Sequence, residues 1–147
     1  MTQEEKQLLL KDLCSRLPYG VKVTTTNPAV KIGVISGISI KNKISVETKD
    51  ANIVFDCTEV KPYLRPLSSM TKEEKEEMHN LLSPEGTAIY KNDGIAVPIN
   101  HFGEFIPYEF MGRIIQYLLE HHFDFMELIP KGLAIEAPEG MYNIKEQ

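Results

Sequence analysis

The first apolar positions of the chain recur with the spacing of a helix. Four leucines follow one another at steps of one, three and four residues: Leu9, Leu10, Leu13 and Leu17. Thr2 and Glu5 match the Thr-x-x-Glu pattern of a capping box, and Pro18 and Gly20 follow where such a helix would end. The spacing predicts a helix of about fourteen residues whose apolar stripe docks on the domain. Its charged residues are expected mainly on the solvent side: Glu4, Lys6, Lys11 and Arg16.

Between Val21 and about Pro66 the apolar period changes to two, which is typical of strands. Five segments show this alternation or a short apolar run: residues 21–24, 30–34, 44–47, 53–55 and 60–64. The alternation slips at Gly37, which indicates a bulge or a sharp bend. Pro62 and Pro66 cannot donate ladder hydrogen bonds, so the fifth strand is expected to be an edge or to leave the sheet there. Five short strands so close together predict a small, strongly curled barrel of SH3-like or OB-like size.

The second half of the chain has helical spacing interrupted by one hairpin. A helix is predicted over residues 72–82, with Thr71 or Ser69 as its N-cap. Two apolar runs joined by Asn-Asp-Gly at residues 92–94 predict a β-hairpin. A further helix is predicted over residues 108–122, where the apolar stripe is wide.

The elements together predict an α+β fold with an N-terminal helix, a small five-stranded SH3-like barrel, and then helices with a β-hairpin. We expect residues 1–70 to form the helix and the barrel, and residues 71–147 to form a helical and hairpin part packed on them. One single domain is the alternative, since 147 residues suffice for one core without a disulfide or a metal.

The stretch HHFDFMELIPKGLAIEAPEGMYN attracts attention because it combines two histidines with an aspartate. Adjacent residues of a helix point about 100° apart, so His121 and His122 cannot easily share one ion. The chain has no HExxH or HxH motif and no cysteine cluster. We therefore expect the histidines to end a helix, Asp124 to start the next turn, Gly132 to stop it, and residues 133–135 to return to a sheet. No metal and no cofactor are predicted.

No catalytic constellation is recognisable in the sequence. Ser36 in VISGI lacks the first glycine of a GxSxG elbow, and Cys57 lies in a predicted strand, where an inert thiol is the default. Walker A and GxGxxG motifs are absent. Carboxylates are frequent in the second half, but no spacing selects an acid/base pair among them: Glu104, Glu109, Glu120, Glu127 and Glu136. A hydrolase whose carboxylates are gathered by the fold stays open as an alternative.

Composition and charge favour a globular protein outside the membrane. Hydrophobic residues make up 42% of the chain and charged residues 25%, which are ordinary globular values. No basic start precedes an apolar segment, and no apolar run approaches about 20 residues, so a cytoplasmic protein is expected. Cys14 and Cys57 lie in apolar contexts and form no CxxC pair, which favours two buried free thiols over a disulfide.

The charge is distributed unevenly, and this bears on the partner. Residues 1–66 carry ten Lys/Arg and seven Asp/Glu, whereas residues 67–147 carry six and fourteen. Small barrels often bind nucleic-acid strands through a basic face with aromatic residues. Six residues on or between the predicted strands are candidates for binding a nucleic acid or another partner: Lys22, Lys41, Lys43, Lys61, Tyr63 and Arg65. The aromatic residues are few, however, and the whole chain is acidic, with a net charge of −5.

Three segments stand out as a set: LLLKDLCSRLPYGVKV, EVKPYLRPLSSMTKEEKEE and HHFDFMELIPKGLAIEAPEGMYN. They resemble a group of short proteins encoded by gut Bacteroidales genomes and by their prophages or mobile elements. Where such relatives have DYRGLI, this chain has DFMELI at residues 124–129, with Met-Glu in place of arginine-glycine. The group brings no known activity, catalytic residue or cofactor with it. The resemblance implies a phage-related or mobile-element origin.

These observations lead to one expected function and two alternatives. We expect a non-enzymatic interaction module that binds a protein partner, because a small barrel is combined with no recognisable catalytic motif. The first alternative is a nucleic-acid-binding barrel that uses the basic N-terminal half, and the second is the carboxylate-based hydrolase. The sequence predicts no oligomeric state.

Overall fold

The computed structural model describes residues 1–39, 41–82, 88–92, 95–99 and 107–142 of an α+β protein. Backbone contacts divide the chain into unit 1, which comprises Met1–Leu67 and Leu119–Gln147, and unit 2, which comprises Ser68–Leu118. The sequence-based division at residues 70 and 71 places the C-terminal segment in the second part, whereas the contacts group it with unit 1. The reason is that this segment adds two short strands to the sheet of unit 1.

Helix α1 (Gln3–Arg16) begins with the predicted capping box. The Thr2 hydroxyl accepts a hydrogen bond from the Glu5 N–H at 3.1 Å, and the Thr2 N–H donates to the Glu5 carboxylate at 2.7 Å. The prediction that Arg16 faces solvent is wrong, because its side chain is fully buried. It turns inward because Asp12, one helical turn earlier, is buried with it and pairs with its charge.

After a short 3-10 helix, η1 (Leu17–Tyr19), the chain forms four strands: β1 (Lys22–Thr25), β2 (Gly33–Ile38), β3 (Lys43–Glu47) and β4 (Asn52–Asp56). Consecutive strands pair antiparallel, and the register of β2 on β3 shifts next to Gly37, where a bulge is predicted. The second strand begins later than predicted because the Val30 N–H bonds to the Asn27 carbonyl in a turn. A Cβ on Gly33 would collide with the Val46 side chain, so the close approach of β2 to β3 requires glycine there.

The fifth strand, β5 (Val60–Pro66), follows the 3-10 helix η2 (Cys57–Glu59) and pairs with three strands. It is antiparallel to β1, and parallel to β8 (Phe123–Asp124) and β9 (Ile135–Glu136). The expected return of the chain to a sheet near residues 133–135 is thus confirmed by β9. Pro66 ends β5 as expected. Pro62 lies inside the strand, and β5 is not an edge, because it pairs with β1 and also with β8 and β9. The nitrogen of Pro62 faces away from β1, so its lack of an N–H removes no hydrogen bond from the β1–β5 ladder.

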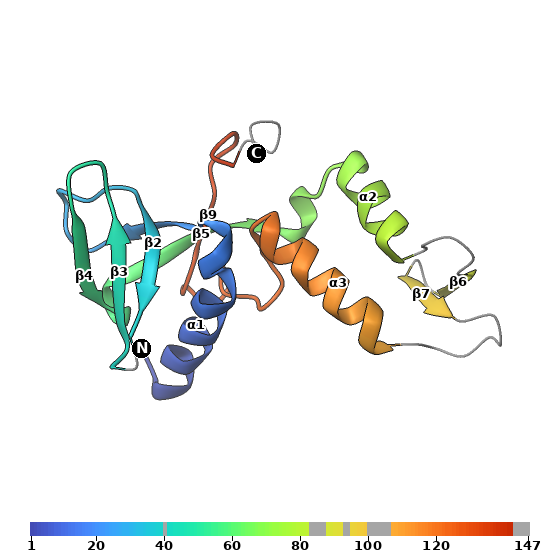
Figure 1. Cartoon of the computed structure of the whole chain (residues 1–147), viewed down its shortest axis with the longest axis horizontal. Helices are drawn as coiled ribbons and strands as arrows, with labels where there is room; N and C mark the ends of the chain where they lie inside the picture. The colour runs from blue at the N-terminus through green and yellow to red at the C-terminus, as the bar shows by residue number, and fades with distance from the viewer. Residues whose placement is uncertain (40, 83–87, 93–94, 100–106, 143–147) are drawn as a thin grey trace. The chain divides into compact units, whose positions relative to one another are not determined.

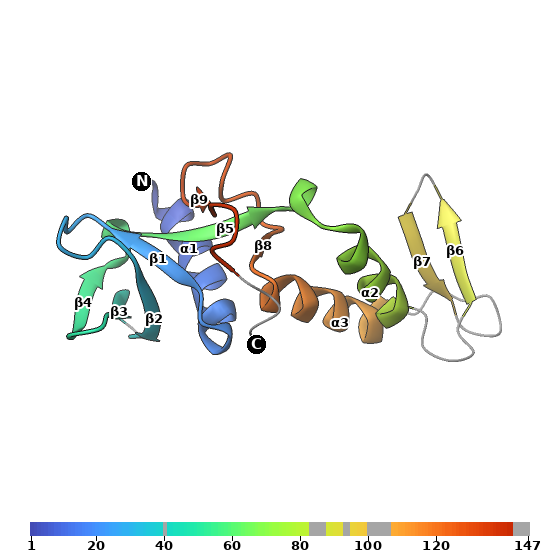
Figure 2. The same ribbon diagram turned by 90° about the horizontal axis from the view of Figure 1, so that it is seen from above.

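The strand order of unit 1 is β4-β3-β2-β1-β5-β8, with β9 also on β5 (Figures 1 and 2). Within the described part of the chain β4 pairs with β3 alone. The sheet is consequently not closed, and a five-stranded barrel is not confirmed. Its inward side chains form one core with α1 and the C-terminal segment: Leu9, Leu13, Val21, Val23, Ile44, Val46, Phe55, Val60, Leu64, Leu128 and Leu133.

Unit 2 contains the predicted helices and hairpin. Its elements are α2 (Lys72–Leu82), β6 (Ala88–Asn92), β7 (Ile95–Ile99) and most of α3 (Pro107–Glu120). Thr71 caps α2, because its hydroxyl accepts from the Glu74 N–H at 3.1 Å. The two hairpin strands pair antiparallel, and the predicted turn at residues 93 and 94 lies outside the described residues. Helix α3 ends two residues earlier than predicted, because His122 takes a left-handed backbone conformation with φ 62°.

Candidate interaction surface

The six residues predicted to bind a partner have different environments in unit 1. Lys41 lies in the turn between β2 and β3, Lys61 lies on β5, and both are exposed. Lys22 and Arg65 instead make contacts within the unit through their charged groups, whereas Lys43 is exposed and pairs with Asp56 on the surface. The Tyr63 backbone takes part in the same arrangement as Lys22.

Tyr142 brings Lys22 and Tyr63 together. Its hydroxyl accepts from the Lys22 N–H at 2.9 Å and donates to the Tyr63 carbonyl at 2.8 Å, so it continues the β1–β5 ladder with a side chain. Lys22 also donates its ammonium group to the Met141 carbonyl at 2.8 Å and lies 5.6 Å from the centre of the Tyr142 ring. Burial raises the pKa of the Tyr142 hydroxyl, which keeps it protonated and able to donate.

His122 packs on the ring of Tyr142. The two rings are stacked at 3.7 Å with 19° between their planes. Burial lowers the pKa of His122 to about 3, and the nearby charge of Arg16 acts in the same direction. A histidine with this pKa is neutral at physiological pH and cannot cycle as an acid and base there. Its Nδ1 atom is buried and has no hydrogen-bond partner in the described structure.

A buried ion pair joins α1 to the C-terminal segment. Arg16 Nε donates to Asp12 Oδ2 at 2.7 Å, and Arg16 Nη2 donates to Asp12 Oδ1 at 3.0 Å and to the Phe123 carbonyl at 2.7 Å. Burial raises the pKa of Asp12, and the hydrogen bonds from Arg16 oppose that rise. The pair positions the start of β8 against α1. Both side chains are buried, so their charged groups do not face solvent.

Asp124 has the capping role expected from the sequence. Its carboxylate accepts from the Leu128 N–H at 2.8 Å and from the Ile129 N–H at 2.9 Å, and Gly132 follows with φ 72°. Arg65 is held nearby, since its guanidinium lies 4.2 Å from the centre of the Phe123 ring. His122 and Asp124 of this stretch therefore make contacts that hold the fold of unit 1.

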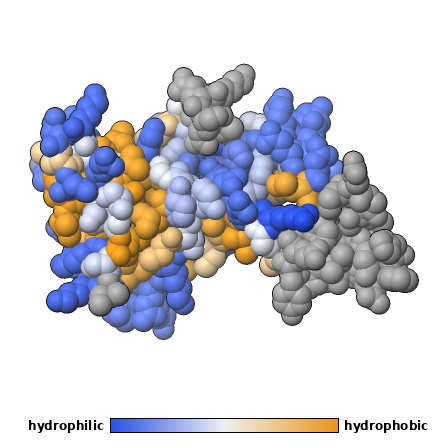
Figure 3. Space-filling view, in the orientation of Figure 1, coloured by the Kyte–Doolittle hydropathy of each residue, from blue (hydrophilic) through white to orange (hydrophobic). Residues whose placement is uncertain are grey.

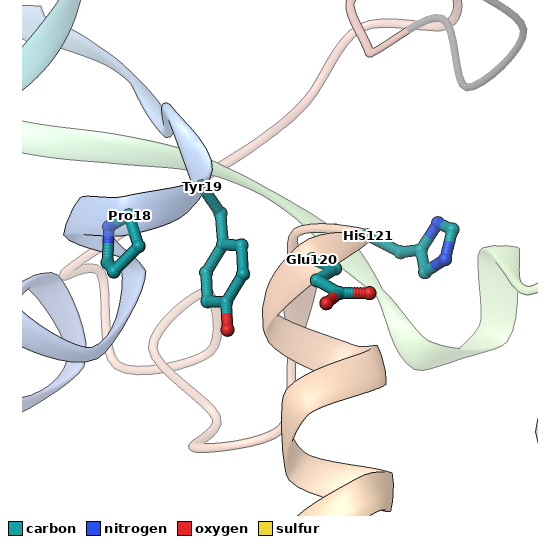
Figure 4. A pocket seen from close by; sticks show the side chains of 4 residues that line it. All are labelled: Pro18, Tyr19, Glu120 and His121. Carbon is teal, nitrogen blue, oxygen red and sulfur yellow. The ribbon is translucent and has the colours of Figure 1, made fainter. Parts of the chain in front are cut away.

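One cleft of about 400 Å³ lies in unit 1 (Figure 4) and is lined by Pro18, Tyr19, Glu120 and His121. Tyr19 and Glu120 reach the same opening from η1 and from the end of α3, whereas the His121 ring is turned away from Tyr19 (Figure 4). A carboxylate beside a phenol offers hydrogen bonds but no nucleophile with its base. The cleft therefore supports binding of a polar group more readily than a covalent reaction.

The described residues contain no group of three or more His, Cys, Asp or Glu side chains that could hold a metal ion. Both cysteines are free, but the prediction that both are buried is wrong for Cys14, which is exposed on α1. Burial raises the pKa of Cys57, which disfavours its thiolate.

The five candidate carboxylates are not gathered into one described cluster. Glu120 lines the cleft, Glu127 pairs with Lys131 at 3.5 Å on the surface, and Glu136 is exposed on β9. The side chains of Glu104 and Glu109 lie outside the described part.

The free edge of β4 is a different kind of surface. The Thr48 N–H donates to the Ala51 carbonyl at 2.9 Å, so Ala51 turns its backbone toward β3. Successive residues of a strand alternate, and the even-numbered residues of β4 therefore turn their N–H and C=O groups away from β3. This edge lies at one end of the strand order (Figures 1 and 2).

The outward backbone groups of β4 are only partly satisfied. The Asp56 N–H donates to Glu59 Oε2 at 2.9 Å in a capping box. Among the described residues, the backbone groups of Asn52 and Val54 have no partner on this side. The edge therefore presents donors and acceptors to any strand that approaches it.

The side chains of Asn52 and Asp56, at the two ends of this edge, are bonded to side chains of β2 and β3, whereas the apolar Val54 between them is exposed. The Ser36 hydroxyl donates to Asn52 Oδ1 at 2.9 Å, and Lys43 pairs with Asp56 at 3.2 Å. Hydrogen bonds from Thr58 lower the pKa of Asp56 to about 2, so the carboxylate is charged at neutral pH. Val54 is 60% exposed, more than any other large hydrophobic residue described.

Apart from its short length and the charged Asp56 at its end, the strand lacks the devices that usually protect a sheet edge. It contains no proline and no lysine, and its register on β3 shows no shift. Apolar surface is visible over β2–β4 in Figure 3. Sequence reasoning noted the run Ile53-Val54-Phe55 but did not select it as a site. The run breaks the alternation of its neighbours, and on an edge strand its middle residue must face solvent.

The division into units also changes the charge argument. Residues 1–67 carry ten Lys/Arg and seven Asp/Glu, and residues 119–147, which belong to the same unit, carry two and six. The net charge of unit 1 is therefore close to zero, because the negative charge of residues 119–147 compensates the positive charge of residues 1–67. Residues 68–118, which form unit 2, carry four basic and eight acidic residues.

Comparison with protein-family models, with curated proteins and with solved structures found no match. None of the described helices combines the length and the apolar character that crossing a bilayer requires.

Proposed function

We propose that the chain is a non-enzymatic protein-binding module of the phage or mobile-element type, which acts in the cytoplasm and binds by strand addition. In this mode a partner segment extends the sheet at β4, so that main-chain hydrogen bonds supply affinity and side-chain contacts supply specificity. The five strands β1–β5, of the size of an SH3-like barrel, serve as the scaffold. The observation that carries the proposal is the uncovered edge of β4 with the exposed Val54 at its centre.

The same geometry favours a protein partner over a nucleic acid. Lys22 and Arg65 make contacts within unit 1, Lys43 is exposed and pairs with Asp56 on the surface, and the unit as a whole is nearly neutral. Nucleic-acid affinity depends on cations that neutralise phosphates, and its strength falls steeply with salt. The two free cysteines are compatible with a reducing compartment.

The test is selection of binding peptides from a displayed library of random extended sequences against the immobilised chain. Val54→Pro removes the outward N–H of the edge without touching the ladder to β3, and should weaken the selected peptides by about tenfold or more. Val54→Thr is the matched control, because it keeps the N–H and a β-branched side chain and should retain most of the affinity.

Two results would contradict this function. Selected peptides that bind the Val54→Pro variant as tightly as the original chain would move the binding site away from β4. A salt-sensitive mobility shift with single- or double-stranded DNA or RNA would favour the nucleic-acid alternative instead. Hydrolysis of a substrate panel, abolished by carboxylate substitutions, would favour the hydrolase.

A further inference from the structure

We infer that the strand added at β4 is the β4 strand of a second copy of this chain, paired antiparallel with Val54 on the two-fold axis. The inference rests on the proposed function, since both use the same edge. It adds the identity of the partner and the register of the pairing. A two-fold interface requires the surface to be complementary to itself, and β4 meets this requirement in its backbone and in its side chains.

The backbone of the edge is self-complementary. Val54 turns both its N–H and its C=O outward, so two copies can exchange two hydrogen bonds at this residue. The next outward pair joins Asn52 of one copy to Asp56 of the other. The Asp56 N–H is already bound by Glu59, so this pair contributes the Asn52 N–H to the Asp56 carbonyl in each direction.

The side chains on the outer face match in the same register. The exposed Val54 of one copy meets Val54 of the other, which removes apolar surface of both from water. Asn52 stands opposite the Asp56 carboxylate. The amide oxygen of Asn52 accepts from Ser36, so its NH₂ group remains as the donor toward that carboxylate.

Neighbouring registers are less favourable. An axis one residue earlier would set Asp50 opposite Asp56, and an axis two residues earlier would set Asp50 opposite Val54. An axis one residue later would set Asp56 opposite Val54, and an axis two residues later would set two Asp56 carboxylates opposite each other. Like charges directly opposite are destabilising, and an apolar residue gains little from a carboxylate. The axis at Val54 alone pairs apolar with apolar and amide with carboxylate.

The short strand predicts a weak dimer. Five residues of edge bury far less than the roughly 1,200 Å² typical of a stable interface, so association should depend on protein concentration. Contacts with Ser36, Lys43 and Glu59 restrain the two ends of the edge before pairing. This preorganisation lowers the entropy lost on association.

The experiment is oxidative cross-linking of the full chain carrying Val54→Cys and Cys14→Ser. Residues opposite each other in a hydrogen-bonded antiparallel pair have Cα atoms about 5.5 Å apart, a spacing that a disulfide spans. The native Cys57 is 1% exposed and does not compete. Ile32→Cys in the same Cys14→Ser background is the matched control, because Ile32 is also an exposed apolar residue, at 51%, and lies off β4.

The Val54→Cys dimer should form about tenfold faster than the Ile32→Cys dimer. Equal rates would overturn the second copy as the partner. A second measurement is sedimentation of the original chain and of Val54→Lys, which sets two ammonium groups opposite each other on the axis. The variant should lose the concentration-dependent dimer, and a dimer that persists in it would also overturn the inference.

The two proposals fail in different ways. If Val54→Pro abolishes peptide binding but Val54→Cys does not cross-link preferentially, the edge binds a different protein, and only the second-copy inference falls. If neither result appears, the strand-addition function falls as well.

Discussion

In the sheet of unit 1, β5 is covered by further strands on the side away from β1, whereas β4 is open on the side away from β3. At β5 the C-terminal segment supplies partners for the strand: the Arg65 N–H donates to the His122 carbonyl at 2.8 Å, and the Ala137 N–H donates to the Leu64 carbonyl at 2.7 Å. At β4 the Glu59 carboxylate accepts from the outward Asp56 N–H, no described residue pairs with the outward backbone groups of Asn52 and Val54, and the exposed Val54 lies at the centre of the strand.

We interpret the covered side at β5 as important for stability and the open side at β4 as important for binding. Burial of the segment that covers β5 takes a charged pair, a neutral histidine and a tyrosine hydroxyl out of water, which costs free energy unless these groups are hydrogen-bonded. Sheets that avoid pairing protect their edges with charges, proline or bulges, and of these β4 has only the charged Asp56 at its end, which pairs with Lys43. We therefore expect substitutions on the covered side to reduce stability, and substitutions on the open side to change association.

The largest effect is expected from Asp12→Ala. It leaves the fully buried Arg16 without its carboxylate and should lower the free energy of unfolding by about 3–5 kcal/mol, measured by urea denaturation. Lys131→Ala is the control, because it breaks an exposed pair with Glu127 at the same four-residue spacing and should cost less than about 1 kcal/mol. Equal losses would mean that Arg16 does not hold the covered side.

Acid should also weaken the covered side. The pKa of His122 is about 3 in the folded chain and about 6.5 when exposed, so the unfolded state binds the proton first as the pH falls below about 6.5. The stability that the neutral histidine provides is complete above that pH and is lost toward pH 3. Between pH 7 and pH 4 the loss should be about 3 kcal/mol.

The variant His122→Asn isolates this contribution, since asparagine tolerates the left-handed backbone and does not titrate. Burial raises the pKa of Asp12, which acts in the opposite sense, but it does so in both proteins and cancels in their difference. Parallel urea midpoints of the two proteins from pH 7 to pH 4 would contradict the account.

A smaller loss is expected from Tyr142→Phe. The change removes the hydroxyl that joins the Lys22 N–H to the Tyr63 carbonyl and should cost about 1–2 kcal/mol. The ring and its stacking on His122 remain. Amide exchange of Lys22 should become faster, and an unchanged exchange rate would show that the hydroxyl does not continue the ladder.

The smallest effect on stability is expected on the open side. Val54→Lys changes an exposed residue and should shift the free energy of unfolding by no more than about 0.5 kcal/mol, while it removes self-association. A loss of stability comparable to that of Asp12→Ala would show that Val54 belongs to the core and would remove the distinction between the two sides.

Local patterns predicted most of the elements. The capping box at Thr2, the bulge at Gly37 and the cap at Asp124 are decided within a few residues, and the structure confirms all three. The burial of Arg16 depends on the Phe123 carbonyl, which is distant in sequence, so no local period could reveal it. The grouping of residues 119–147 with unit 1 also depends on contacts between residues distant in sequence, so local patterns did not predict it.

The environments of the candidate binding residues depend on the tertiary structure more than the secondary-structure elements do. Lysines on strands were selected as a binding face, but Lys22 and Lys43 have partners that only the tertiary structure brings close. The unpaired edge could not be identified either, because the strand order is a property of the whole sheet. The run Ile53-Val54-Phe55 was the only local indication.

The most direct measurement of the open edge is amide hydrogen exchange of Val54, followed by NMR in dilute and in concentrated protein. In dilute solution this amide should exchange nearly as fast as an unprotected one, and in concentrated solution it should slow by about threefold or more as β4 pairs with β4. The Arg65 amide, bound to the His122 carbonyl, should be protected at both concentrations. A Val54 amide already protected in dilute solution, or one indifferent to concentration, would contradict the central claim.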